Sequence, residues 1–258
     1  MSNLKINNEN GISKVTINRP ESLNALNKDL IKELTSFFTE AADNNDIKVI
    51  VLTGAGGKSF VAGADISNMA AADPQEAIKF ARRGQKLMRA METLPKPIIA
   101  AVNGFALGGG LEIALACDFI YASDNAKFGF PEVTLGIIPG FGGTQNLPRL
   151  IGTNKSRELI YTGKMIDAEK ALSWGIVNRI SSQENLMADV LETAAAIIKN
   201  GMIAVGFAKE CIDRGMSMSK EEAFMYESTL FGSLFSTEDQ KAGMAAFLEK
   251  RKANFKNR

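Results

Sequence analysis

The run Gly104-Phe105-Ala106-Leu107-Gly108-Gly109-Gly110 leads into Leu111-Glu112 and an apolar segment that predicts a helix over residues 108–117. Three consecutive glycines leave the backbone bare, so another chain segment or a ligand can lie directly against its N–H groups. The first N–H groups of a helix have no partner within it and carry the positive end of the helix dipole. The run therefore fits an oxyanion site beside a carboxylate, and it equally fits tight packing of a helix on a strand.

Two nucleotide-binding motifs are excluded at this run. It contains no Gly-x-Gly-x-x-Gly pattern, which dinucleotide-binding folds use, and no Gly-Lys-Ser/Thr follows it, as a phosphate-binding loop requires.

The chain contains no histidine. Histidine is the side chain that titrates near neutral pH without help from its surroundings. Its absence excludes Ser-His-Asp and Cys-His catalysis and histidine-ligated zinc. Proton transfer near pH 7 must then use a carboxyl with a raised pKa, or a cysteine, lysine or tyrosine with a lowered one.

Outward from the glycine run, short β-branched segments alternate with amphipathic ones. Strands are predicted at residues 12–17, 47–52, 97–102 and 118–122, and helices at 28–42 and 74–92, the second capped by Asp73 with Pro74 at its first position. This alternation is typical of parallel strands joined by helical crossovers, so the sequence predicts an α/β fold.

The second half of the chain is mostly helical in pattern. Helices are predicted at residues 157–161, 168–174, 185–199, 203–214, 220–235 and 238–250, with a short strand at 176–180. We therefore predict an α/β core over residues 1–195, carrying the site, and a helical region over residues 196–258. The basic residues from Lys250 to Arg258 fit a solvated face, or alternatively a contact to a ligand phosphate.

Two further segments have the small or apolar residues of a binding site. In Phe60-Val61-Ala62-Gly63-Ala64-Asp65-Ile66, three small residues allow close approach to the backbone, although an ordinary turn would use them too. In Gly129-Phe130-Pro131-Glu132-Val133, apolar neighbours favour the protonated form of Glu132, whereas Glu112 near a helix start is biased toward ionisation. Two carboxyl groups whose pKa values are pushed apart suggest one acid and one base.

Composition sets the broad class. The 258 residues are 45% hydrophobic and carry a net charge of +1, which gives no reason to expect nucleic acid or an acidic membrane surface as a partner. Cys117 and Cys211 are predicted to be buried and reduced, as in a reducing compartment. No early segment resembles a signal peptide, and no stretch reaches the roughly 18 apolar residues of a membrane span. The expectation is a cytoplasmic protein.

At these residues the chain resembles the enoyl-CoA hydratase (crotonase) family over essentially its whole length. The matching motifs are Asn18-Arg19-Pro20 with Leu23-Asn24-Ala25-Leu26, Ala62-Gly63-Ala64-Asp65-Ile66, Lys96-Pro97 to Asn103-Gly104, Gly108 to Glu112, Pro131-Glu132, Pro139-Gly140-Phe141-Gly142-Gly143-Thr144-Gln145, and Phe247 to Lys256. The overall pattern is most similar to bacterial short-chain members, which interconvert crotonyl-CoA and 3-hydroxybutyryl-CoA.

The resemblance implies a fold and an activity. The fold would be the crotonase (ClpP-like) spiral of ββα repeats, with a C-terminal helical region that forms trimers or dimers of trimers. The activity would be reversible syn hydration of a short-chain 2-trans-enoyl-CoA in fatty acid or butanoate metabolism. No metal and no cofactor would be needed, because coenzyme A is part of the substrate.

The resemblance also implies roles for residues. Glu112 would be the base on water and Glu132 would supply the α-proton, while the backbone N–H groups of Ala64 and Gly109 would bind the thioester oxygen. The implied substrate and coenzyme A contacts are Leu23, Ala25, Ala62, Gly63, Ala64, Asp65, Ile66, Phe105, Gly108, Gly109, Leu135 and Gly140.

Two residues depart from the family pattern. Phe130 stands where close relatives often carry Gln, beside the implied acid, which leaves acyl-chain preference open. Ser67 stands where many relatives have Lys near the coenzyme A phosphates, which would weaken binding unless the basic C-terminal residues compensate.

Other functions compatible with the pattern are a different reaction on the same fold (isomerisation, decarboxylation or thioester hydrolysis), an RNA-associating homologue, and a catalytically silent scaffold. The presence of both glutamates favours hydration, and the lack of a sustained basic stripe disfavours RNA binding.

Overall fold

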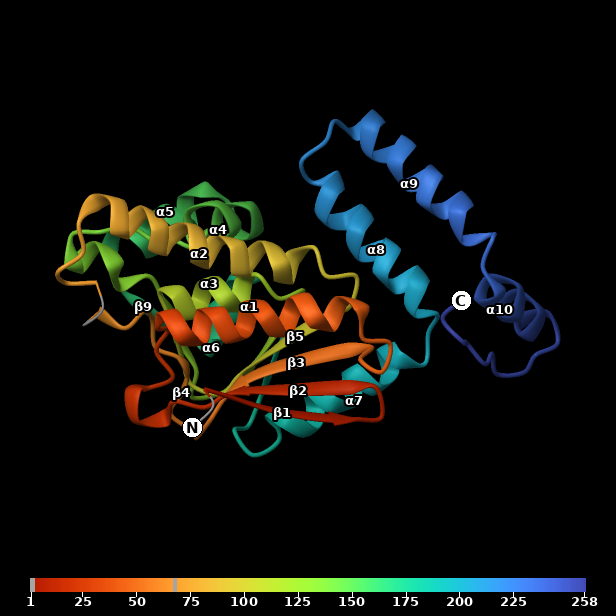
Figure 1. The fold of residues 1–258 in the computed structure, drawn as a ribbon, viewed down its shortest axis with the longest axis horizontal. Coiled ribbons are helices and arrows are strands. Elements are labelled where there is room, and N and C mark those ends of the chain that lie inside the picture. Colours follow the sequence, from red (N-terminus) through yellow and green to blue (C-terminus); the bar gives the residue numbers. More distant parts are fainter. Residues whose placement is uncertain (1–2, 67–68) are drawn as a thin grey trace.

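The computed structural model describes residues 3–66 and 69–258, whose strands form a larger and a smaller sheet (Figure 1). The larger sheet has the order β1-β2-β3-β5-β7-β10: β1 (Leu4–Glu9), β2 (Ile12–Ile17), β3 (Val49–Gly54), β5 (Ile98–Val102), β7 (Phe119–Ser123) and β10 (Arg179–Ser181). The smaller sheet has the order β4-β6-β8-β9: β4 (Ser59–Val61), β6 (Phe105–Leu107), β8 (Lys127–Gly129) and β9 (Met165–Asp167). Pairing is parallel except for β1 with β2 and β8 with β9.

Successive strand pairs wind the chain into a spiral. In each of the pairs β3–β4, β5–β6 and β7–β8, the first strand joins the larger sheet and the second joins the smaller one. Both sheets add these strands in the same order, and a helical segment follows each pair. This is the ββα spiral that the resemblance implies, so the predicted fold class is confirmed.

The helices cover the sheets and extend beyond them. They are α1 (Lys28–Asp43), α2 (Pro74–Glu92), α3 (Gly109–Leu115), α4 (Gly143–Ile151), α5 (Thr153–Thr162), α6 (Ala168–Trp174), α7 (Leu186–Ile198), α8 (Met202–Gly215), α9 (Lys220–Leu234) and α10 (Glu238–Leu248), with 3₁₀ turns η1 (Pro20–Ser22) and η3 (Pro131–Leu135). The predicted cap of α2 is present: Asp73 and Glu76 form a reciprocal capping box, and Pro74 occupies the first turn.

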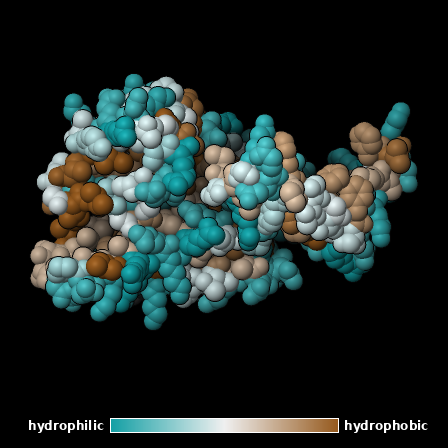
Figure 2. Space-filling view, turned by 90° about the horizontal axis from the view of Figure 1, so that it is seen from above, coloured by the Kyte–Doolittle hydropathy of each residue, from teal (hydrophilic) through white to brown (hydrophobic). Residues whose placement is uncertain are grey.

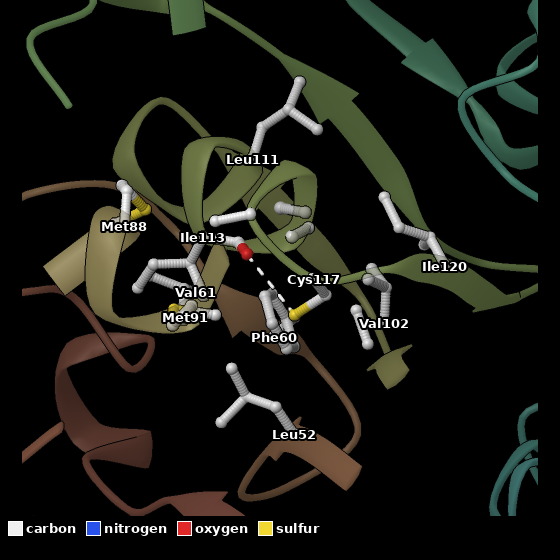
Figure 3. Close-up of a cluster of buried hydrophobic side chains, with 14 of the residues drawn as sticks. Leu52, Phe60, Val61, Met88, Met91, Val102, Leu111, Ile113, Cys117 and Ile120 are labelled. Atoms are coloured by element: carbon white, nitrogen blue, oxygen red, sulfur yellow. Dashed lines mark hydrogen bonds between the residues drawn. The ribbon is translucent and has the colours of Figure 1, made fainter. Parts of the chain in front are cut away.

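The glycine run lets α3 lie directly on the smaller sheet. A Cβ on Gly110 would lie 1.9 Å from the carbonyl oxygen of Val61 in β4, so no larger residue fits there. Below the helix, apolar side chains from β3, β4, α2 and α3 surround Cys117, whose Sγ donates to the Ile113 carbonyl at 3.4 Å (Figure 3). Close packing on the smaller sheet therefore explains Gly110. The alternative explanation, free N–H groups at a helix start, concerns other residues of the same run.

Several predictions of secondary structure need correction. The strand predicted at residues 176–180 is β10, but it begins only at Arg179. The residues just before Arg179 belong to the turn that follows α6. The helix α4 was not predicted, although Leu147 and Ile151 have the i, i+4 spacing of an apolar helix face; the glycines at 140, 142 and 143 and Pro148 indicated a loop. Cys117 is buried as predicted, whereas Cys211 is only half-buried, because α8 belongs to the projecting C-terminal part; both are free thiols.

The C-terminal helices leave the body of the protein. The face of α7 with Leu186, Val190 and Ala194 is buried against β3 and β5, and α8 and α9 then form an antiparallel pair that projects outward, followed by α10 (Figure 1). Within residues 3–66 and 69–258, no single helix has the length and apolar character needed to cross a membrane. The pair α7–α8 meets that criterion only jointly, and it is bent by 106°.

We expect Ser13→Ala to stabilise the protein. Ser13 in β2 is completely buried, and its hydroxyl has no hydrogen-bond partner among the described residues. Removing an unsatisfied buried hydroxyl should raise the free energy of unfolding by about 1 kcal/mol. Denaturant titration at fixed protein concentration measures this as a higher midpoint at unchanged slope.

Ser123→Ala is the matched control in the same sheet. Ser123 is equally buried, but its hydroxyl donates to the Val102 carbonyl at 3.2 Å, so its removal should lower the midpoint. Shifts of the same sign for the two variants would contradict the expectation.

Candidate active site

A cavity of about 780 Å³ opens where the glycine run, the 62–66 segment, η3 and α2 meet. Its wall is mostly apolar, and Glu112 and Glu132 are the titratable groups among its described lining residues. Figure 2 shows apolar side chains gathered at the end of the molecule where α2 begins and the 131–139 segment lies. A concave apolar site with a few convergent polar groups suits a ligand with an acyl chain.

The structure brings most of the residues predicted to contact the substrate to this cavity. Those that line it are Ala62, Gly63, Ala64, Ile66, Gly108, Gly109, Leu135 and Gly140, together with both glutamates. Those that do not line it are Leu23, Ala25, Asp65 and Phe105. The position of Ser67 lies outside the described residues.

Three of the residues outside the cavity, Leu23, Ala25 and Asp65, connect the segments that form its rim. Arg19 donates through Nη1 to the Ala25 carbonyl and through Nη2 to Asp65 Oδ2 at 3.4 Å, which ties the 19–26 turn to the 62–66 segment. The Leu23 carbonyl accepts the N–H of Ala62 at 3.1 Å, and Leu23 itself has a left-handed φ of 51°. These contacts fix the backbone on which the cavity residues stand.

Glu112 is held by the backbone of the 141–143 loop. Its side chain is buried at 2% exposure, and the N–H groups of Phe141 and Gly143 donate to its Oε1 at 2.8 and 2.7 Å. Burial raises the pKa of Glu112, and the N–H groups of residues 141–143 oppose that rise. The donors specifically favour a carboxylate, because an ionised oxygen is the stronger acceptor.

Glu132 has the opposite environment. It follows Pro131 in the first turn of η3, and its buried Oε2 has no hydrogen-bond partner among the described residues. Burial raises the pKa of Glu132 to about 7; its own backbone N–H lowers it, and the neighbouring charge of Glu112 raises it further. When the pair holds a single proton, the N–H donors at Glu112 and the lack of a partner at Glu132 Oε2 favour its location on Glu132.

Ala64 and Gly109, the two residues predicted to supply backbone N–H donors, line the same cavity. Gly109 is the first residue of α3, so its N–H has no acceptor within that helix. On either side of Ala64, the carbonyl of Gly63 and the N–H of Asp65 both bond to Leu26, at 2.9 and 2.8 Å. In extended backbone the N–H of Ala64 then points the other way, toward the cavity that Ala64 lines.

Sequence reasoning missed the contribution of α2. One face of this helix lines the cavity with Ala77, Ile78, Phe80, Ala81 and Gln85. Its amphipathic pattern showed which face is apolar, and nothing in the pattern distinguishes a core from a cavity wall. Phe130, in contrast, is fully buried and does not line the cavity; a Cβ on Gly143 would lie 2.7 Å from its ring.

The ββα spiral is the fold of the crotonase class of acyl-thioester enzymes. The model of the enoyl-CoA hydratase/isomerase family matches residues 7–258. The chain belongs to this family.

Individual relatives are similar to this chain over nearly their full lengths. The chain is 50% identical to a short-chain-enoyl-CoA hydratase of Clostridium acetobutylicum, covering 100% of this chain and 99% of that protein. It is 47% identical to a crotonyl-CoA hydratase of Syntrophomonas wolfei, covering 98% and 97%. The crystal structure of an enoyl-CoA hydratase from Bacillus anthracis superimposes with a TM-score of 0.96 at 38% identity, covering 100% of both chains.

Proposed function

We propose that this protein is a hydro-lyase that adds water to short-chain 2-trans-enoyl-CoA thioesters, crotonyl-CoA among them, with Glu112 and Glu132 as its acid–base pair. The observation that carries the proposal is the placement of two carboxyl groups, the buried Glu112 and the half-buried Glu132, with opposite environments over one apolar cavity. The relatives named short-chain-enoyl-CoA and crotonyl-CoA hydratase support the choice of reaction and chain length.

The chemistry follows from this arrangement. Glu112, in the ionised form that its N–H donors favour, removes a proton from water as the water oxygen bonds to the β-carbon. Charge that develops on the thioester oxygen is stabilised by the N–H groups of Ala64 and Gly109, which are fixed before the reaction begins. Glu132 then delivers its proton to the α-carbon, so that the π bond of the carbon–carbon double bond and one O–H bond of water are replaced by a C–O and a C–H bond. The pair still holds one proton, now on Glu112, which must return to Glu132 before the next turnover.

The proposal includes no metal ion and no cofactor, because backbone N–H groups polarise the thioester carbonyl and coenzyme A enters with the substrate. It also places the protein in the cytoplasm, in keeping with its free thiols; cell fractionation would test this.

A steady-state assay tests the function. Purified protein should remove the enoyl absorbance of crotonyl-CoA and yield 3-hydroxybutyryl-CoA, and a series of longer 2-enoyl-CoA substrates should give declining specificity constants. Isomerised, decarboxylated or hydrolysed products instead would assign a different reaction of the same family. Salt-sensitive RNA binding without turnover would replace the enzymatic proposal.

The pH dependence of the rate should report the shared proton. Both directions require one proton on the pair, so kcat/KM should fall above pH about 7, where Glu132 loses it, by roughly tenfold per pH unit. Hydration and dehydration should show the same profile, because the ratio of their specificity constants equals an equilibrium constant in which no proton is released. A flat profile from pH 6 to 9 would contradict the shared-proton assignment.

Self-association as a trimer, or as a dimer of trimers, is part of the proposal. The projecting α8–α9 arm exposes large apolar side chains that a monomer would leave in water: Ile212, Met216, Phe224, Met225 and Phe231. Light scattering should then give three or six times the chain mass of 27.8 kDa, and a monomer would overturn it.

A further inference from the structure

Within α2, Gly84 is buried in the interior of the helix, where glycine costs stability relative to alanine. The neighbouring ring of Phe141 leaves no room for a side chain at this position. A Cβ on residue 84 would lie 2.1 Å from Cδ1 and 2.3 Å from Cγ of Phe141. Because Cγ is the ring atom nearest the backbone, a rotation of the ring would not relieve the overlap.

The Phe141 ring is almost fully buried between α2 and α3, and Phe141 also lines the cavity. It is 4% exposed, its centroid lies 5.1 Å from that of Phe80, and a Cβ on Gly109 would be 3.6 Å from it. The ring thus fills the space between a bare position of α2 and the bare start of α3. The next residue of α2, Gln85, adds a second tie by donating to the Gly140 carbonyl at 3.0 Å.

We propose that Gly84 is a positioning residue: by admitting the Phe141 ring against α2, it sets the backbone N–H that Phe141 donates to Glu112. The inference rests on the proposed role of Glu112 and extends it to a helix that supplies no titratable group to the site. The residues of α2 that line the cavity are uncharged, and α4 contributes only Thr144 and Gln145, so Glu132 is the titratable group that faces Glu112 among the described lining residues.

The test is a double-mutant cycle on the full-length protein. Gly84→Ala should lower kcat by roughly 10- to 100-fold with a smaller change in KM, because displacement by about 1 Å from the reacting geometry has that effect. Weaker donation to Glu112 favours its protonated form, so the acid limb of the pH profile should move to higher pH. Adding Phe141→Ala removes the overlapping ring, so the double variant should recover to within a few-fold of Phe141→Ala alone.

A matched substitution separates positioning from helix stability. Arg83, next to Gly84 in α2, is exposed and does not line the cavity, so Arg83→Ala changes the same helix without entering the packing against Phe141 and should leave kcat unchanged. Normal kcat and pH profile in folded Gly84→Ala, or no recovery in the double variant, would overturn the inference. Loss of the proposed function would be seen differently, as an inactive wild type or a fully active Glu112→Gln variant.

Discussion

Replacing either glutamate of the pair by glutamine should lower kcat for crotonyl-CoA hydration by about 10²- to 10⁴-fold. Glu112→Gln keeps a side-chain oxygen that can accept the N–H groups of Phe141 and Gly143, because both bonds reach the single atom Oε1. The loop therefore stays in place, and the loss reports the missing base. Glu132→Gln removes the proton that the apolar side of the site offers to the α-carbon.

The two substitutions should not add. Once one partner of a concerted pair is missing, removing the second has little further effect. The kcat of the double variant should therefore be close to that of the less active single variant. Glu184→Gln, an exposed residue outside the cavity, is the control and should keep wild-type kcat. Hydration at the wild-type rate in either site variant would refute the proposed mechanism.

Gly108→Ala should inactivate the enzyme through Glu132. Gly108 has φ 50° and ψ −123°, which a residue with a Cβ adopts only under strain, and its Cβ would lie 2.6 Å from Glu132 Oε1. The carboxyl must then move while the strand-to-helix turn is strained. We expect kcat to fall by about 10²-fold or more, measured on protein shown to be folded by circular dichroism.

Gly152→Ala provides the comparison for backbone strain alone. Gly152 also has a positive φ, 82°, and among the described residues no atom lies within 4 Å of its Cβ position. This variant should lose stability by about 1–3 kcal/mol and retain kcat. Equal loss of kcat in the two variants would mean that strain, and not displacement of Glu132, causes the effect.

The sequence predicted the larger sheet far better than the smaller one. Strands such as β3 and β5 are continuous apolar runs of five or six residues, long enough for a pattern to show. The strands β4, β6 and β8 have three residues each, too few for a period of two to appear. These strands form because each turn of the spiral places the chain beside the preceding turn, where they can pair. Their pairing therefore depends on the whole fold.

The site shows a similar division. The environment of Glu132 could be inferred locally, from its apolar neighbours. That of Glu112 could not: the helix start before it predicted a bias toward ionisation, whereas burial raises its pKa and its N–H donors belong to the distant 141–143 loop. The meeting of the two glutamates over one cavity could not be inferred either, since they belong to successive turns of the spiral. The part played by Gly84 was also beyond reach, because an interior helix glycine has no meaning until Phe141 is seen against it.

The smaller sheet also governs the spacing of the acid and the base. Glu112 follows β6 and Glu132 follows β8, and these strands are adjacent and hydrogen-bonded in register, with Leu107 opposite Gly129. The two segments therefore start one strand separation apart, about 4.8 Å, a distance that peptide hydrogen bonding keeps nearly constant. Evolution on such a scaffold can exchange the groups at the ends of the two strands, but it cannot easily alter the gap between them. New reactions would then arise by substitution of these groups, while the spacing of their two segments stayed the same.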